Sequence, residues 1–203
     1  MNTVTELDLA HMQPGFAEPV HEAQAAFRCV LDALSQPGRV RVMPAAITPP
    51  AGLSVARAAM LLALADYDTP VWLAPALRDG AAGHYLRFHC GCPLTAGLSD
   101  AHFVVLDGLA ALPDLDTLRL GDPAYPDRSA TLLIEVSELA EGGPITLRGP
   151  GIESTRSISV AGWTAQTTAF VQQNRAGFPL GVDIVFSCGD RIMGLPRTSI
   201  VEI

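Results

Sequence analysis

The chain has 203 residues, 49% of them hydrophobic, and carries a formal net charge of −8 at pH 7. A chain of this length buries enough apolar surface to fold without disulfides or metal ions, so we expect one domain covering residues 1–203. All 13 basic residues are arginine, and they form no cluster. Because binding to a nucleic-acid backbone needs a basic stripe, nucleic acid is excluded as a partner.

The absence of lysine excludes several kinds of catalysis. A pyridoxal-phosphate enzyme needs a lysine amine for its Schiff base, and Walker-type phosphate loops and protein kinases each need a lysine of their own. Arginine remains available for bidentate recognition of phosphate or carboxylate groups.

The composition is typical of a protein of the cytoplasm. Four cysteines are too few and too unevenly spaced for a disulfide framework, and we find no basic segment followed by an apolar core of the signal-peptide kind. The longest apolar stretch, residues 58–65, is too short to span a bilayer. We therefore expect a cytoplasmic protein with no membrane partner.

The first third of the chain predicts an arm, two helices and a short strand. Residues 1–18 lack periodicity and indicate an arm that is either flexible or docked on a partner. Apolar residues recur at helical spacing over residues 19–35, and a Pro-Gly pair follows them as a stop signal. A strand is expected at residues 39–43. Residues 54–66 predict a second helix, apolar on nearly all sides and therefore buried.

The middle of the chain predicts strands joined by turns. Strands are expected at residues 71–73, 84–89, 103–106 and 131–136, of which the last is a continuous apolar run typical of a central strand. Residues 113–118 indicate a short helix or turn.

The last third predicts more strands and one helix. Strands are expected at residues 145–147, 157–160, 182–187 and 191–193, with a helix over residues 163–174 among them. We find no repeat and no linker between the elements. The pattern predicts an α/β fold, a single domain whose central mixed β-sheet is flanked by helices.

One cluster of residues has the chemistry of a metal site. His84, His89, Cys90 and Cys92 lie within nine residues, and neutral imidazole and thiolate both bind zinc. The spacing is poor, however, because neighbouring residues of a strand face opposite sides, and no second pair of ligands follows. The two cysteines are also compatible with burial as small apolar groups. We therefore predict no metal.

No catalytic residue can be assigned from motifs. Asp66 and Asp68 can act as a carboxylate pair, but Asp at a helix end before Pro more commonly makes turn hydrogen bonds. A Gly-x-Ser-x-Gly nucleophile elbow is missing, so a serine hydrolase is unsupported. Asp183 is flanked by apolar residues and is either exposed to solvent or an inward polar anchor.

Two arginine-bearing turns are the candidate sites. In Arg148-Gly149-Pro150-Gly151, successive amides can form a concave anion nest and Arg148 adds a forked charge, although Pro150 donates no N–H. The alternative is a tight connection between two strands. Arg197 lies in a second turn with glycine and proline, Gly194-Leu195-Pro196-Arg197. The geometry of a turn accounts for the glycine and the proline, but it does not require the arginine. We therefore predict Arg148, Gly149, Gly151 and Arg197 as possible anion-binding or assembly residues.

Several motifs occur in a fixed order along nearly the whole chain. They are LSQPG at 34–38, DTPV at 68–71, LRFH at 86–89, LRGPGI at 147–152, FPLGVD at 178–183 and GLPRT at 194–198. Together they resemble the phosphonate-metabolism PhnH family, whose members are subunits of the carbon–phosphorus lyase core complex. Cys90-Gly91-Cys92 departs from the family pattern, so these cysteines are interpreted as incidental.

The resemblance implies an accessory role. The fold of the family resembles the large domain of pyridoxal-phosphate-dependent transferases, but its members are not known to bind that cofactor. The absence of lysine in this chain agrees with this. The family implies a homodimer that assembles with subunits G, I and J and supports the formation of α-D-ribose 1-methylphosphonate 5-triphosphate from ATP and phosphonate. No catalytic or cofactor-binding residue of the chain is implied. The alternative is a stand-alone enzyme that binds a phosphorylated small molecule through arginines.

Overall fold

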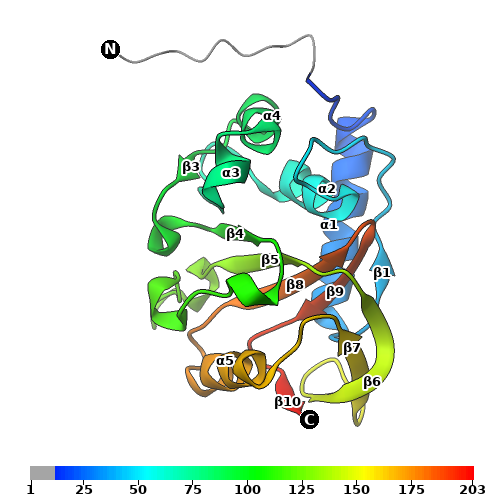
Figure 1. The fold of residues 1–203 in the computed structure, drawn as a ribbon, viewed down its shortest axis with the longest axis vertical. Coiled ribbons are helices and arrows are strands. Elements are labelled where there is room, and N and C mark those ends of the chain that lie inside the picture. Colours follow the sequence, from blue (N-terminus) through cyan, green and yellow to red (C-terminus); the bar gives the residue numbers. More distant parts are fainter. Residues whose placement is uncertain (1–11) are drawn as a thin grey trace.

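The structure, a computed structural model, describes residues 12–203 and is built around a seven-stranded sheet of order β1-β9-β8-β5-β4-β2-β3 (Figure 1). Strands β3, β2, β4, β5 and β8 are parallel neighbours, whereas β9 is antiparallel to both β8 and β1. The strands are β1 (Arg41–Val42), β2 (Val71–Leu73), β3 (Leu94–Thr95), β4 (Phe103–Leu106), β5 (Thr131–Glu135), β8 (Asp183–Cys188) and β9 (Arg191–Leu195).

A second, antiparallel sheet of order β10-β6-β7 lies beside helix α5 at one end of the molecule (Figure 1). Its strands are β6 (Leu139–Arg148), β7 (Arg156–Val160) and β10 (Ile200–Glu202). The β6–β7 register shifts between Glu141 and Ile145, as in a β-bulge.

Helices cover both faces of the large sheet. Ser54 caps α2 through its side chain, and Thr164 and Thr167 form a capping box that starts α5. None of the helices in residues 12–203 is long and apolar enough to cross a membrane. The helices are α1 (Pro19–Ser35), α2 (Val55–Leu64), α3 (Pro75–Arg78), α4 (Ala81–His89) and α5 (Ala165–Ala176), with 3₁₀ turns η2 (Leu98–Asp100), η3 (Leu109–Ala111), η4 (Leu115–Thr117) and η5 (Pro126–Arg128).

The core has two halves, one on each face of the large sheet. Alternate residues of a strand point to opposite faces, so Val104 and Leu106 join one half while Val105 joins the other. The Val105 half packs under α1, α2 and α4. The other half lies between the large sheet, α5 and the small sheet, so both sheets share it.

The predicted mixed sheet flanked by helices is confirmed, and most predicted elements lie within a few residues of their expected places. The strand predicted at residues 84–89 is wrong, because these residues belong to α4. Its buried residues are Ala82, Gly83, Tyr85 and Leu86, which share a helical face, while Phe88 is exposed. The apolar residues of this segment therefore follow the helical period and not the alternation of a strand.

The predicted N-terminal arm lies partly outside the described residues, which begin at residue 12. In the described part, α4 holds the backbone of the arm at two points. Tyr85 donates a hydrogen bond from its hydroxyl to the carbonyl of Pro14 at 3.2 Å, and His89 Nε2 is hydrogen-bonded to the carbonyl of Gln13 at 3.0 Å. Burial raises the pKa of Tyr85 to about 12, so the hydroxyl keeps its proton and remains a donor.

Candidate functional site

A hollow of about 670 Å³ lies at the carboxyl ends of the parallel strands. In open α/β sheets this edge is where ligands bind, because the loops that follow neighbouring parallel strands meet there. Its walls come from the segments after β4, β5 and β8 and from the turn before α5. The lining residues are Asp107, Gly108, Leu109, Ala110, Glu135, Val136, Ser137, Ala161, Gly162, Cys188 and Gly189.

A buried arginine supports the acidic wall of this hollow. Arg57 of α2 reaches the edge of the sheet, where its Nη1 donates to Asp107 Oδ1 at 2.6 Å. Its Nε lies 3.2 Å from Glu135 Oε2, an ion pair without a hydrogen bond at that nitrogen. Nη2 donates to the carbonyl of Gly52 at 3.1 Å. One arginine thus ties α2 to the ends of β4 and β5.

Glu135 has further partners that hold its carboxylate in place. The Ser54 hydroxyl donates to Oε2 at 2.7 Å, and the Ser187 hydroxyl donates to the same oxygen at 2.5 Å. The Gly189 amide donates to Oε1 at 2.9 Å. Three donors from other segments thus occupy both oxygens of this carboxylate. The arrangement therefore fits a structural junction better than acid–base catalysis.

The sequence motifs do not include Arg57, Asp107 or Glu135. The signal was present in the sequence, because Arg57 is the one charged residue of an otherwise apolar helix. An arginine on a buried helix needs carboxylate partners, since a buried unpaired charge is very costly. The identity of those partners depends on strand order, which the sequence pattern did not reveal.

Arg197, a predicted candidate, is held inside the structure as the centre of a polar cluster. Its Nη2 lies 2.6 Å from Asp183 Oδ2, and its Nε donates to Asp183 Oδ1 at 3.2 Å. Other guanidinium N–H groups donate to the carbonyls of Pro126 and Pro179 and to the Ser129 hydroxyl. Of the two alternatives for Asp183, the structure therefore shows the inward polar anchor. The guanidinium of Arg197 is bound by groups of the chain itself.

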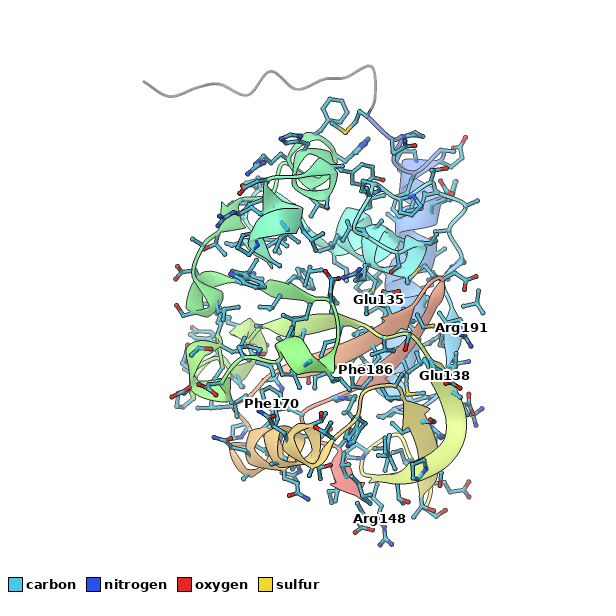
Figure 2. The ribbon with its side chains drawn as sticks, in the orientation of Figure 1. Glu135, Glu138, Arg148, Phe170, Phe186 and Arg191 are labelled. Carbon is cyan, nitrogen blue, oxygen red and sulfur yellow. The ribbon has the colours of Figure 1, made fainter. Side chains whose placement is uncertain are left out.

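Arg148, the other predicted candidate, lies half-exposed at the end of β6. Figure 2 shows it beside β10 at the opposite end of the molecule from α4, whereas Glu135 lies nearer the middle. Its Nε is 3.6 Å from Glu202 Oε2, a surface pair of little energetic weight. Gly149 and Gly151 follow it with positive φ angles, in the turn that leads from β6 towards β7. The turn thus connects two strands, and an anion-binding role for it stays a prediction.

Three of the sequence motifs converge where this turn packs. A Cβ on Gly151 would lie 2.1 Å from the carbonyl of Ser35, so the turn touches the end of α1. The amide of Gly38 donates to the carbonyl of Gly194 at 3.1 Å, and Arg148 pairs with Ile200 in the β10–β6 register. Motifs at 34–38, 147–152 and 194–198 therefore build one junction between α1 and the two sheets.

The remaining candidate residues have local roles. Asp66 Oδ1 accepts hydrogen bonds from the Thr69 hydroxyl at 2.6 Å and from the Asp68 amide at 3.0 Å, as predicted for a turn. The Thr69 bond lowers the pKa of Asp66 below its usual value. Among residues 12–203, no group of three or more His, Cys, Asp or Glu side chains is arranged to hold a metal ion.

The two cysteines of the Cys90-Gly91-Cys92 segment lie at the end of α4. Cys90 Sγ donates to the carbonyl of Leu61 at 3.6 Å. The neighbouring Cys92 and burial raise the pKa of the Cys90 thiol, whereas the neighbouring Cys90 lowers the pKa of Cys92. Cys92 is buried in the half of the core under α4. All four cysteines, Cys29, Cys90, Cys92 and Cys188, are free thiols.

Comparisons with known proteins assign the chain to a family. A family model described as "Bacterial phosphonate metabolism protein (PhnH)" matches residues 14–202. A protein of Rhizobium meliloti (strain 1021) named "Alpha-D-ribose 1-methylphosphonate 5-triphosphate synthase subunit PhnH" is 40% identical over 187 residues, 92% of this chain and 94% of the relative. The "Putative C-P lyase subunit protein HtxG" of Stutzerimonas stutzeri is 33% identical over 185 residues, 89% and 86% of the two chains. The chain therefore belongs to the PhnH family of bacterial phosphonate metabolism proteins.

Proposed function

We propose that the chain is an accessory subunit of the carbon–phosphorus lyase core complex, which acts in the cytoplasm in phosphonate catabolism. In this role it supports the formation of α-D-ribose 1-methylphosphonate 5-triphosphate from ATP and phosphonate. It does so as a homodimer that assembles with subunits G, I and J. The observation that carries the proposal is the match to a named synthase subunit over nearly the full length of both chains.

The polar groups of the structure support a role in assembly. The Arg57 and Arg197 clusters direct their charges to partners within the chain. Arg148 is half-exposed on a turn that Gly149 and Gly151 shape, so its guanidinium is available to another protein. We assign Arg148 and its turn to the assembly surface, and Arg197 to the support of the fold through Asp183.

The test is co-purification of the tagged chain with subunits G, I and J from a common expression strain. We expect a stable complex, and we expect product formation from ATP and methylphosphonate to require this chain. Arg148→Ala is expected to weaken recovery of the complex without changing the fold. A chain that never associates with the other subunits would contradict the proposal.

A stand-alone enzyme that binds a phosphorylated small molecule through arginines is the alternative, and the exposure of Arg148 is the observation that favours it. It predicts turnover by the purified chain and loss of that turnover in Arg148→Ala. Activity that requires the other subunits would exclude it.

We also infer that the fold is related to the large domain of pyridoxal-phosphate-dependent transferases, and that one such domain covers the chain without binding the cofactor. The parallel strands and the absence of lysine support this inference, because the internal Schiff base needs a lysine amine. Equilibrium dialysis against pyridoxal phosphate should show no binding, and retention of the cofactor by the chain would contradict the inference.

A further inference from the structure

Helix α1 has two apolar faces, although a helix on a protein surface normally needs one. Its buried face is made of small residues, Ala26, Val30 and Ala33. This face packs against α2 and β9, so the helix lies on the face of the large sheet that α2 and α4 also cover (Figure 1).

The second face is exposed. Val20, Phe27 and Leu31 are 80%, 49% and 54% exposed, and Gln24 between them is exposed as well. These four residues are spaced by four, three and four positions along the helix, and the half-buried Leu34 follows three positions after Leu31. This is the spacing of the contact seam between two packed helices. We call Val20, Gln24, Phe27, Leu31 and Leu34 the α1 seam. It is about 21 Å long at 1.5 Å per residue.

We propose that the α1 seam is the surface through which two copies of this chain associate, with the two α1 helices antiparallel about a twofold axis. A twofold interface must be complementary to itself, because the same patch contributes both sides. The C-terminal part of the seam meets this condition, because Phe27, Leu31 and Leu34 pack on the same three residues of the second copy.

The charges beside the seam support a copy as the occupant and support the antiparallel direction. Arg28 and Asp32 are both exposed and lie one turn apart along the same flank of the seam. In antiparallel helices the same flanks of the two copies meet. A twofold axis near residue 30 then places Arg28 of each copy opposite Asp32 of the other, so two ion pairs form. This inference rests on the homodimer of the proposed function and identifies its surface.

Charge substitution in the seam tests the proposal on the full chain. Phe27→Asp and Leu31→Asp should each raise the dissociation constant of the dimer on the order of 100-fold, because each places two carboxylates in the apolar contact. Sedimentation velocity over a concentration series measures this shift. Phe88→Asp, on α4 and 51% exposed in the same way, is the matched control and should leave self-association unchanged.

A charge exchange tests the direction of the helices. Arg28→Asp alone should weaken the dimer, because it sets acidic groups against Asp32 of the other copy. Arg28→Asp combined with Asp32→Arg should restore the dissociation constant to within about threefold of the parent. Circular dichroism spectra and melting curves equal to those of the parent are expected for every variant, because the altered side chains are exposed.

Three outcomes would overturn the proposal. The first is a parent chain that stays monomeric at every concentration, and the second is a dimer that Phe27→Asp and Leu31→Asp leave intact. The third is self-association that persists while Phe27→Asp loses binding to subunits G, I or J, which would make the seam the site of another subunit. Co-purification of the parent chain with those subunits reports on the proposed function independently of all three.

Discussion

Replacing Arg57 with methionine tests whether the buried ionic network holds α2 to the sheet. The substitution keeps most of the side-chain volume and removes the positive charge between Glu135 and Asp107. Removing one partner of a buried ion pair costs about 3–5 kcal/mol. Glu135 is 23% exposed and keeps its bonds from Ser54, Ser187 and Gly189, so we expect the lower end, about 3 kcal/mol.

Asp107 adds little to this loss, because its side chain is 54% exposed and is solvated once unpaired. In a chain of this size each kcal/mol lowers the melting temperature by about 2–4 °C, so Arg57→Met should melt about 6–12 °C below the parent. Asp107→Asn is the control and should change the free energy of unfolding by less than about 1 kcal/mol.

The assay is equilibrium unfolding in urea. Arg57→Met should lower the urea concentration at the midpoint and leave the slope of the unfolding free energy against urea concentration unchanged. Glu135→Gln alone should also destabilise the chain, since it leaves Arg57 with the partly solvated Asp107. The double variant Arg57→Met/Glu135→Gln should lose less than the sum of the two single losses, by about 0.5–3 kcal/mol. A loss of less than about 0.5 kcal/mol in Arg57→Met would refute the reasoning.

The arginine turns, one close glycine contact and one histidine give further predictions. Arg197→Ala should cost about 3 kcal/mol, because it leaves Asp183 unpaired, whereas Arg148→Ala should stay within about 0.5 kcal/mol of the parent, as thermal unfolding will measure. Gly151→Ala should destabilise the chain more than Gly142→Ala, since both residues have φ near +80° but only Gly151 lies against a backbone carbonyl; equal losses would contradict this. Burial lowers the pKa of His102 below 6.5, so His102 takes up more protons in the unfolded chain than in the folded chain. Stability should therefore fall as the pH drops from above 6.5 through the folded pKa. A pKa of His102 at or above 6.5, measured by proton NMR of the folded chain, would contradict this.

Elements with a clear period and a clear stop were predictable from the sequence. The helix over residues 19–35 is observed as α1, and the apolar run from 131 is the central strand β5. The period of α1 nevertheless concealed two faces. Phe27 and Leu31 belong to the helical pattern, and yet the structure exposes them. Periodicity identifies a helix, but only packing decides which apolar face is buried.

The carboxyl-edge hollow was not predictable, because it depends on which strands are neighbours. Asp107 and Glu135 lie 28 residues apart in the chain and meet because β4 and β5 are adjacent and parallel. Arg57 comes from a helix 50 residues before Asp107. No local spacing encodes such a set. The unusual arginine in an apolar helix was the one local sign that carboxylate partners exist.

The motifs that reveal the family are mainly those that hold the fold together. Gly151 is required where the turn meets the end of α1, and Arg197 is required where Asp183 begins β8. A residue type that only one packing arrangement accepts is recognisable in a sequence, whatever chemistry the protein performs. Arg148 is different, because no buried partner requires its charge. If the chain acts through assembly, the functional residues are therefore the exposed ones that packing leaves unexplained, namely Arg148 and the α1 seam.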